Sequence, residues 1–316
     1  MPDDFPLIGW TGTGRMGFAL AGRLLDAGIP LALYNRTRAK AEPLAARGAG
    51  AHVVHDVRQL GPCDVVFTMV AGSDDFAEVT TGERGLLTAD AAPGVIVDCS
   101  TVDAEVSAAV RTAAAKTGTA LLAAPISGNP KVVAAGRASL VVSGPEDTFR
   151  RVLPLLTALG GSVTYVGTGE AARLVKLAHN MVLAVVAQAL AESVVLAERH
   201  GVSRAAYLEF LNSSVLGSAF SRYKSPALVG LDFTPTFTTT MLRKDLDLGL
   251  AAARTAEVPM PLTAAVHQLV QAAVGAGHGG SDFAALLLEQ ARAAGLTLTS
   301  EDAEVDDGLS GTGGPR

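Results

Sequence analysis

The chain has 316 residues, enough for one large domain or two ordinary ones, each with its own core. Hydrophobic residues make up 49% of it, and a net charge of -6 with no basic stripe argues against a nucleic-acid partner. The two cysteines, Cys63 and Cys99, exclude a disulfide framework and have no metal-ligand spacing, so we expect reduced buried thiols and no metal site.

The amino terminus and the longest uncharged segments bear on the location of the protein. Asp3 and Asp4 stand where a signal peptide would carry a basic segment. Residues 177–191 and 258–281 contain no Asp, Glu, Lys or Arg, but the first segment is too short to cross a bilayer and the second is interrupted by prolines and polar residues. The sequence therefore predicts a cytoplasmic protein with no membrane partner.

A dinucleotide-binding pattern opens the chain. An apolar run at 7–10 leads into the motif Gly12-Thr13-Gly14-Arg15-Met16-Gly17, a helical pattern follows, and residues 31–34 predict a second strand. A strand, Gly-x-Gly-x-x-Gly, a helix and a strand within about thirty residues form the context in which this motif binds a dinucleotide. In that role Gly12 allows the tight turn, Gly14 lets the pyrophosphate approach the backbone, and Gly17 lets the helix pack closely. The alternative is a glycine-rich loop without a ligand.

The end of the second strand indicates which cofactor is bound. An acidic residue is expected there to hold the ribose 2′-hydroxyl of NAD, but the sequence reads Asn35-Arg36-Thr37-Arg38. Asn35 has no charge to repel a 2′-phosphate, Arg36 offers a guanidinium to bind it, and Thr37 adds a donor. The sequence therefore predicts a preference for NADP(H), with NAD(H) still possible. The alternative is that Arg36 and Arg38 form only a solvated turn.

Strand and helix patterns continue to alternate up to residue 166. Apolar runs predict strands at 65–70, 95–98, 120–124, 140–143 and 162–166, with a capped short helix starting within 71–75 and longer helices at 103–116 and 145–159. Such alternation gives a mostly parallel sheet covered on both faces, with ligands at the carboxyl ends of the strands. We therefore expect the loops at Val70, Ser100-Thr101 and Ser127-Gly128 to contact cofactor and substrate, although each alone could be an ordinary turn.

Residues 170–199 predict one long helix that ends before Gly201. The segment is rich in Ala, Leu and Glu, has no Gly or Pro, and would be about 45 Å long at 1.5 Å per residue. Its larger apolar residues recur at helical spacing, which predicts burial along most of the helix; they are Val175, Val182, Val186, Leu190 and Val194. Lys176 and Asn180 lie one turn apart on one face, where they could line a cleft. The alternative is a lysine that reaches solvent from a core helix beside a locally bonded asparagine.

The second half contains helical patterns only. They run at 203–213, 238–256, 262–276 and 281–294, which predicts an all-α domain carried by the long helix. Lys244 lies one turn into one of these helices, where it could also be a surface charge pair. From Ser300 the chain is acidic and rich in glycine, which is typical of a disordered tail. The predicted organisation is a Rossmann domain at 1–167, a helical domain at 168–298 and a tail at 299–316.

Four motifs stand in an order that resembles the β-hydroxyacid dehydrogenase family. They are Gly12-x-Gly14-x-x-Gly17 with Met16, Ala124-Pro125-Ile126-Ser127-Gly128, Lys176-Leu177-x-x-Asn180 and Lys244-Asp245-Leu246. The resemblance covers roughly residues 7–295, and the family includes 3-hydroxyisobutyrate dehydrogenase, tartronate semialdehyde reductase and glyoxylate/succinic semialdehyde reductases. It implies an α/β Rossmann-type domain with a parallel sheet, followed by an all-α 6-phosphogluconate-dehydrogenase-like domain. Separately, the Ala- and Val-rich helical half predicts a homodimer or homotetramer.

The resemblance also implies roles for individual residues. Lys176 corresponds to the catalytic lysine, and the substrate-binding positions are Ser127, Gly128, Asn180 and Thr101. The cofactor-binding positions are Gly12, Thr13, Gly14, Arg15, Met16, Asn35, Arg36, Thr37, Val70, Thr101 and Lys244. In the expected mechanism Lys176 exchanges the hydroxyl proton with the substrate while hydride moves to or from the nicotinamide, and desolvation favours the neutral amine.

Four positions depart from the family pattern. Ala123 and Asn129 replace an Asp and a Gly around the second motif, and Glu170 and Ala172 replace two glycines before the lysine. A charged Glu170 near the pocket mouth could change which acid fits, so the substrate stays open. An imine reductase of the same architecture is one alternative, although such enzymes usually carry another residue at the position of Lys176. A non-catalytic NADP-binding protein is the other.

Overall fold

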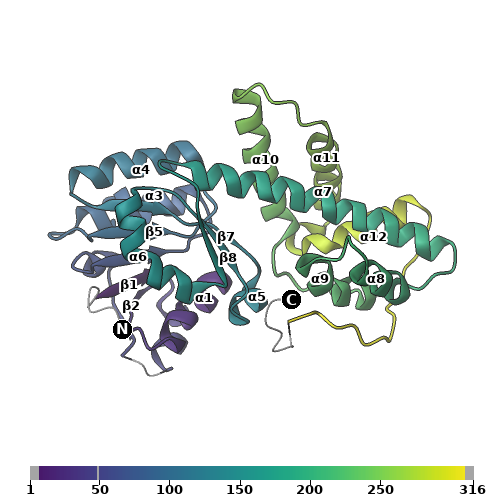
Figure 1. Ribbon diagram of the computed structural model, residues 1–316, viewed down its shortest axis with the longest axis horizontal. Helices are drawn as coiled ribbons and strands as arrows, with labels where there is room; N and C mark the ends of the chain where they lie inside the picture. The colour runs from purple at the N-terminus through teal and green to yellow at the C-terminus, as the bar shows by residue number, and fades with distance from the viewer. Residues whose placement is uncertain (1–6, 48–49, 310–316) are drawn as a thin grey trace. The chain divides into compact units, whose positions relative to one another are not determined.

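The chain forms two compact units, Met1–Lys176 and Leu177–Arg316 (Figure 1). The computed structural model describes residues 7–47 and 50–309. In the first unit a parallel sheet is combined with helices, and the described part of the second is built from helices. This architecture confirms the predicted fold class. The boundary between the two units falls within the long helix Ala171–Arg199. The predicted domain boundary is residue 167, just before this helix.

Six parallel strands form the main sheet of the first unit. They are β1 (Ile8–Thr11), β2 (Ala32–Tyr34), β3 (His52–Val53), β4 (Val65–Thr68), β5 (Val95–Asp98) and β6 (Ala120–Ala123). Their order is β3-β2-β1-β4-β5-β6, so β1 lies between β2 and β4. The strand order reverses next to β1, and folds of this kind bind ligands at the carboxyl ends of the strands at such a point.

Helices cover both faces of this sheet. They are α1 (Arg15–Asp26), α2 (Glu42–Ala45), α3 (Ser73–Thr81), α4 (Ala104–Lys116), α5 (Pro130–Ala134) and α6 (Glu146–Leu159), with short 3-10 turns η1 (Arg38–Lys40), η2 (Val57–Leu60) and η3 (Leu86–Thr88). Trp10 and Phe67 enter the core shared with α1 and α6, where their rings stack with centroids 5.5 Å apart. Val66 and Ile96 enter the core under α3 and α4. Successive strand residues thus reach opposite cores, as the pleat requires.

A second, smaller sheet follows the first. It consists of β7 (Ile126–Ser127), β8 (Ser139–Val142) and β9 (Ser162–Tyr165), with β7 antiparallel and β9 parallel to β8. The last two predicted strands of this unit therefore exist but belong to a separate sheet. An isolated antiparallel bridge between Ala123 and Ser143 connects β6 to the end of β8.

Among the described residues, six helices build the second unit or lead into it. They are α7 (Ala171–Arg199), α8 (Arg204–Ser213), α9 (Ala219–Gly230), α10 (Thr239–Thr255), α11 (Pro261–Gly275) and α12 (Leu286–Ala293), with the short turns η4 (His278–Gly280) and η5 (Phe283–Ala285). Leu208, Leu242, Leu246, Val270 and Leu287 form the centre of its core. Helix α9 was not predicted, and the other helices agree with the predicted ranges to within a few residues.

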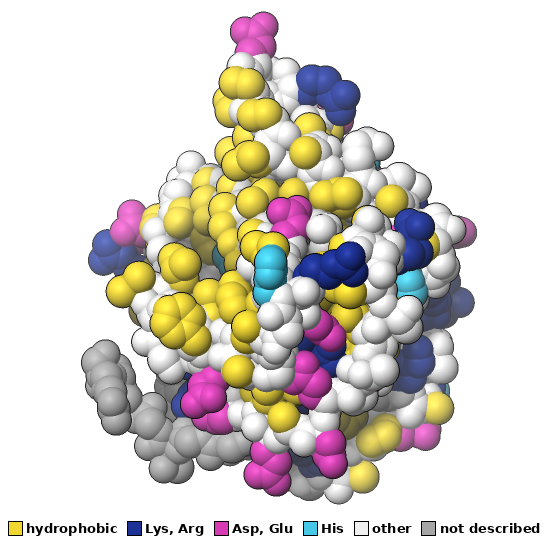
Figure 2. Space-filling view, turned by 90° about the vertical axis from the view of Figure 1, so that its right-hand side faces the viewer, with side chains coloured by type: hydrophobic (Ala, Val, Ile, Leu, Met, Phe, Trp, Pro, Cys, Tyr) yellow, Lys and Arg dark blue, Asp and Glu magenta, His cyan; other side chains and the backbone are white. Residues whose placement is uncertain are grey.

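The prediction that the large apolar residues of α7 are buried along most of the helix is wrong for its first half. Val175, Val182 and Val186 are exposed, whereas Leu190 and Val194 are buried. The buried face of α7 combines alanines such as Ala184 with larger apolar side chains such as Leu177 and Met181. Figure 2 shows yellow hydrophobic side chains gathered on the surface of the second unit. By length and composition α7 is apolar enough to cross a membrane, but a core helix of a soluble protein meets the same criterion.

Residues 299–301 of the carboxyl-terminal segment are hydrogen-bonded to the second unit, and Val305 packs against its core. The Glu301 carboxylate accepts hydrogen bonds from Arg204 N at 2.7 Å and Ala205 N at 3.0 Å, and so occupies the N-terminus of α8. Ser300 Oγ donates to Gly230 O at 2.9 Å. The start of the predicted tail, which ran from residue 299 to 316, is thus attached to the helical unit through Glu301. Residues 310–316, and Asp3 and Asp4 at the other end, lie outside the described residues.

Candidate active site

The loop between β1 and α1 has the backbone that a dinucleotide motif needs. Gly12 adopts φ +92°, and a Cβ there would lie 2.2 Å from Met69 O. A Cβ on Gly17 would lie 1.9 Å from Gly12 O, so this glycine lets α1 pack on the loop. At Gly14 a Cβ would meet nothing within 4 Å, and α1 begins directly afterwards without a side-chain cap. Its first amides can therefore bind a diphosphate, and the loop fits a dinucleotide.

Asn35 has a structural role in this loop. Its Oδ1 accepts a hydrogen bond from Thr13 N at 2.8 Å, and its Nδ2 donates to Thr37 O at 2.8 Å. A neutral amide can accept and donate at once, whereas a carboxylate only accepts. The absence of an acid at the end of β2 thus has a local cause in addition to any effect on the cofactor.

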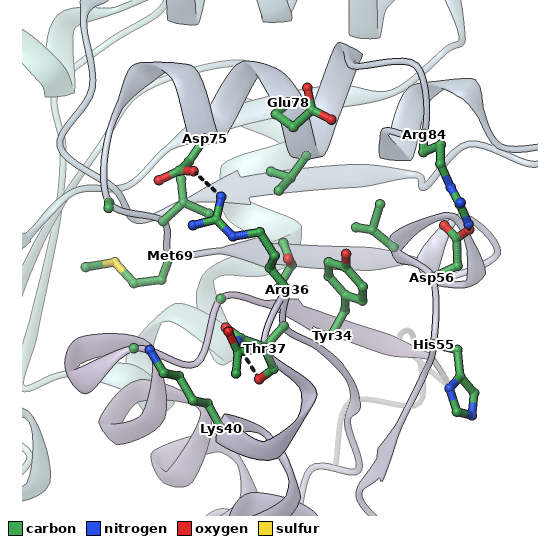
Figure 3. A pocket seen from close by; sticks show the side chains of 18 residues that line it. Tyr34, Arg36, Thr37, Lys40, His55, Asp56, Met69, Asp75, Glu78 and Arg84 are labelled. Carbon is green, nitrogen blue, oxygen red and sulfur yellow. Dashed lines mark hydrogen bonds and ion pairs between the residues drawn. The ribbon is translucent and has the colours of Figure 1, made fainter.

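A pocket of about 520 Å³ opens at the carboxyl ends of β1, β2 and β4 (Figure 3). Among the predicted cofactor residues, those that line it are Gly12, Gly14, Asn35, Arg36, Thr37 and Val70. Thr13 is bound to Asn35 beside the pocket, and Arg15 and Met16 begin α1. The structure thus brings most of the predicted cofactor residues of the first unit around one cavity.

Arg36 is already paired with a carboxylate in this pocket. Its Nη1 lies 3.1 Å from Asp75 Oδ1, and the side chain of Arg36 is 85% exposed against 35% for Asp75. Figure 3 shows the guanidinium extending toward Asp75 on α3. This helix starts inside the predicted 71–75 segment with Gly72 as its N-cap, and no side chain caps it. Arg36, which is predicted to bind the 2′-phosphate, therefore already forms an ion pair with Asp75, and sequence analysis did not identify this pair.

A second ionic cluster forms another wall of the pocket. Arg58 Nη2 donates to Asp56 Oδ2 at 2.8 Å, and Arg84 Nη2 donates to the same oxygen. The hydrogen bonds from Arg58 and Arg84 hold the pKa of Asp56 well below its ordinary range. Asp56, Arg84 and Lys40 all line the pocket, so this wall carries charges of both signs.

Asp98, at the end of β5, organises the loops that carry predicted site residues. This buried carboxylate accepts hydrogen bonds from Thr68 Oγ1 at 2.5 Å and Ser100 Oγ at 2.7 Å. Ser100 Oγ in turn accepts a hydrogen bond from Val70 N at 2.9 Å. The ends of β4 and β5, which lead to Val70 and Thr101, are therefore fixed to one another.

The same carboxylate holds the first turn of α7. Arg173 Nη2 lies 2.8 Å from Asp98 Oδ2, and Arg173 Nη1 donates to Ser100 O at 3.1 Å. Glu170 bridges two arginines, with 3.3 Å to Arg173 Nε and 2.7 Å to Arg111 Nε. Both Glu170 oxygens are thus engaged by arginines of this network, and the effect of Glu170 on which acid fits stays a prediction.

The loop that contains Ser127 and Gly128 has its own constraints. Gly128 adopts φ +132°, and a Cβ there would lie 3.0 Å from Val132 Cγ1, so the position requires glycine. Ser127 pairs with Ser139 in the ladder between β7 and β8. The Asn129 side chain accepts a hydrogen bond from Val132 N at 3.0 Å and caps α5. Asn129, one of the departures from the family pattern, thus serves a local helix.

Helix α7 carries the predicted catalytic lysine. Lys176 is buried, with 9% of the residue exposed, and Asn180 is buried one turn further along. Asn180 Nδ2 donates to Asp245 Oδ2 at 2.6 Å, and Asp245 Oδ1 lies 3.3 Å from Lys244 Nζ. The Asp245 carboxylate therefore forms a charge pair with Lys244 and also accepts a hydrogen bond from Asn180. Lys176 belongs to the first compact unit, and Asn180 and Lys244 belong to the second.

Sequence analysis missed the charged residues that hold the predicted ones in place. They are Asp75, Asp98, Arg173 and Asp245. A weak signal existed for two of them, since Asp98 ends an otherwise apolar strand and Asp245 follows Lys244 directly. When a charged side chain pairs with a residue on a distant segment, the spacing of residues along the sequence does not identify that partner.

A Rossmann-type sheet with a glycine loop shaped for a diphosphate, followed by a helical unit, defines a nicotinamide-dinucleotide-binding oxidoreductase. Residues 7–167 match the model of the NAD binding domain of 6-phosphogluconate dehydrogenase, and residues 167–289 match that of NADP-dependent 3-hydroxyisobutyrate dehydrogenase. The chain belongs to the β-hydroxyacid dehydrogenase family. It is an NAD(P)-dependent enzyme that transfers hydride to or from a small hydroxy acid or its semialdehyde.

Relatives with this organisation include bacterial oxidoreductases. The chain is 32% identical to the uncharacterized oxidoreductase YfjR of Bacillus subtilis, over 87% of this chain and 96% of the relative. It is 30% identical to 3-hydroxyisobutyrate dehydrogenase of Pseudomonas aeruginosa, over 88% of this chain and 96% of the relative.

Solved structures agree with this assignment. Mycobacterium tuberculosis 3-hydroxyisobutyrate dehydrogenase with L-serine has a TM-score of 0.77 at 28% identity, over 90% of this chain and 98% of that one. Psf3 in complex with NADP+ and 2-OPP has a TM-score of 0.81 at 26% identity, over 90% and 99%. An imine reductase from Pseudomonas sp. has a TM-score of 0.61 at 22% identity, over 90% and 99%, which shows a shared fold only.

Proposed function

We propose that the enzyme prefers NADP(H) and interconverts a small β-hydroxy acid and its semialdehyde, with Lys176 as the general acid and base. The observation that carries the proposal is that Lys176 is buried on α7 one turn before the buried Asn180. This burial argues against a lysine that reaches solvent from a core helix, because an ammonium group is costly to desolvate, and buried ionisable groups are frequent at functional sites.

The proposed mechanism assigns one task to each residue of the chain. When bound, the nicotinamide supplies or accepts the hydride. Lys176 gives a proton to the carbonyl oxygen in reduction and takes it from the hydroxyl in oxidation. Asn180 uses one N–H for Asp245, so its second N–H can hold the same substrate oxygen. Ser127 and the Gly128 amide bind the substrate carboxylate, with Thr101 beside the reacting ring.

The cofactor preference is proposed from the pocket at the end of β2. Arg36 and Thr37 line it together with the glycine loop, and Asn35 places no negative charge there. A guanidinium is the side chain best suited to a phosphate monoester. The relative solved with NADP+ supports this preference. Lys244, which lies outside this unit, is proposed as a further cofactor contact.

We also propose that the protein is a cytoplasmic homodimer or homotetramer without a nucleic-acid partner. Soluble monomers rarely expose contiguous apolar patches. Helix α7 and the α8 region carry exposed apolar residues, which therefore support an assembly. These residues are Leu174, Val175, Val182, Val186, Leu196, Phe210, Val215 and Leu216. The net charge of -6 gives no attraction to nucleic acid.

A substrate screen tests the proposed function. The full chain is assayed with small 3-hydroxy acids and the matching semialdehydes, using NADP(H) and NAD(H), by absorbance of the reduced nicotinamide. We expect turnover of at least one acid–semialdehyde pair and a higher kcat/KM with NADP(H). Reduction of a cyclic imine without turnover of any acid would identify an imine reductase instead. Tight NADPH binding without turnover of any compound would indicate a non-catalytic binding protein.

A further inference from the structure

We propose that Asp75 limits the preference of this enzyme for NADP(H) over NAD(H), because it competes with the 2′-phosphate of the cofactor for the guanidinium of Arg36. The inference rests on the proposed NADP(H) preference and adds the residue that tunes it. Asp75 becomes a specificity-determining residue that never contacts the reacting atoms.

The geometry places the pair across the cofactor pocket. Arg36 follows β2 and Asp75 lies in the first turn of α3 after β4, and these two strands flank β1 in the sheet. The bridge of 3.1 Å between Nη1 and Oδ1 therefore joins segments on either side of the loop that begins at Gly12. Both side chains and the Gly12 and Gly14 backbone line the same cavity of about 520 Å³. In Figure 3 the guanidinium points to Asp75 across this cavity.

The exposure of the two partners shows which one can move. The Arg36 side chain is 85% exposed, so little holds it except the ion pair, whereas Asp75 is 35% exposed and lies on a helix. The ion pair with Asp75 occupies only Nη1 of Arg36, and a guanidinium binds a phosphate best through two parallel donors. A 2′-phosphate that takes Nη1 must therefore displace Asp75, and one that binds the remaining donors lies near the negative charge of Asp75. NAD(H) has no phosphate at this position and leaves the pair intact, so the penalty applies to NADP(H) alone.

The size of the effect follows from the exposure of the pair. Exposed ion pairs contribute little to stability, so removal of the competing carboxylate should tighten NADP+ binding about two- to fivefold. The gain should shrink as salt is raised, because exposed charges are screened over about 8 to 10 Å at physiological ionic strength.

The experiment measures dissociation constants by titration calorimetry on the full chain. The ligands are NADP+, NAD+, and the adenosine-side fragments 2′,5′-ADP and 5′-AMP, which report binding without hydride transfer. The variants are Asp75→Asn, Arg36→Ala and the double variant. Asp74→Asn is the matched control, because it removes the same charge from the same helical turn at an exposed position that does not line the pocket.

We expect Asp75→Asn to tighten NADP+ and 2′,5′-ADP two- to fivefold, and to leave NAD+ and 5′-AMP unchanged. The gain should vanish in the Arg36→Ala background and be absent in Asp74→Asn. If Arg36→Ala weakens NADP+ but Asp75→Asn changes nothing, the inference is overturned while the NADP(H) preference stands. If neither variant affects NADP+, both are overturned.

Discussion

At the scale of single residues, two glycines of the first loop are required for different physical reasons. At Gly12 a side chain would be strained by φ +92° and would collide with Met69 O. At Gly14 a side chain would enter open space, which is where the diphosphate is expected. Stability and cofactor binding can therefore be separated within one motif.

Alanine at each position tests this separation. We expect Gly12→Ala to lower the free energy of unfolding by about 1–3 kcal/mol, the usual cost of a strained backbone position. Gly14→Ala should leave unfolding nearly unchanged but weaken NADPH binding by at least about tenfold, equal to about 1.4 kcal/mol. Denaturant unfolding and cofactor titration measure the two effects. Equal loss of stability in both variants would contradict the assignment of Gly14 to the ligand.

That Gly12, Gly14 and Arg36 line one pocket could be predicted from sequence, but their interactions could not. The order of Gly12, Gly14 and Arg36 along the chain was enough to place them at one end of the sheet. The pairing of Arg36 with Asp75, and the bond from Thr13 to Asn35, depend on rotamers and on segments far apart in sequence. The pairing of Glu170 with Arg111 on α4 escaped sequence analysis for the same reason.

At the scale of elements, one buried ion pair holds the helix that carries Lys176. Arg173 and Asp98 have side chains only 1% and 0% exposed, and their charges lie 2.8 Å apart. Removal of one partner leaves the other charge buried and unpaired. The start of α7 is thus fixed to β5. Removal of one partner of such a pair destabilises the fold by much more than the intact pair stabilises it.

Replacement of Arg173 by glutamine tests this attachment. We expect Arg173→Gln to lower the free energy of unfolding by about 3–5 kcal/mol. Arg150→Gln is the control, because Arg150 pairs with Glu146 at 2.6 Å but is 71% exposed, and its loss should cost less than about 1 kcal/mol. Denaturant unfolding followed by circular dichroism gives both values. Similar small losses in the two variants would show that the buried pair does not hold α7.

A second buried pair, Lys224 with Asp282, makes the helical unit sensitive to acid. Burial opposes ionisation of Asp282, but the charge of Lys224 and hydrogen bonds from Lys224, Ala284 and Thr236 outweigh it and lower the pKa. A carboxylate whose pKa is lower in the folded state stabilises the fold above its unfolded pKa of about 3.9. That stability is lost as the pH falls through the folded pKa.

Asp282→Asn should therefore destabilise the protein most at neutral pH. We expect a loss of about 3–5 kcal/mol at pH 7, and a smaller difference from the unchanged protein as the pH falls below about 4. Asp26→Asn is the control, since Asp26 pairs with Arg47 at 2.6 Å on the surface. Unfolding at several pH values provides the measurement. A difference that does not narrow on acidification would contradict the linkage to Asp282.

Most elements could be predicted, and the exceptions have physical causes. Helix α9 was missed because Pro226 stands where it would break a helix. The small sheet of β7, β8 and β9 looks like a continuation of the parallel sheet in sequence, because strand patterns do not tell which sheet a strand joins. The contact of Glu301 with α8 was not predicted, because the sequence does not show which distant amides a carboxylate will cap.

At the scale of the whole molecule, the exposed apolar face of α7 requires a partner or an explanation. Val175, Val182 and Val186 are exposed, although Leu190, Val194 and several alanines of the same helix enter the core. Exposed apolar residues gathered on one element often mark an interface. We therefore expect the exposed valines to be buried against a second copy of the chain.

A charge on this face should break the proposed assembly. Val182 is 65% exposed, so Val182→Glu should leave the fold intact but shift the protein from dimer or tetramer to monomer. Thr112→Glu, on the exposed side of α4, is the control and should not change the assembly. Light scattering coupled to size-exclusion chromatography measures both. If the protein without substitutions already runs as a monomer, the assembly proposed from this face is contradicted.

The central claim is that Lys176 transfers the substrate proton, and the most direct test is the turnover of Lys176→Ala with the best substrate of the screen. We expect kcat to fall by at least about a hundredfold, the usual contribution of acid–base catalysis, while the dissociation constant of NADPH stays within about twofold. Lys116→Ala, which removes an exposed lysine from α4, should retain full activity. If Lys176→Ala keeps near-normal kcat, another group carries the proton and the account is wrong.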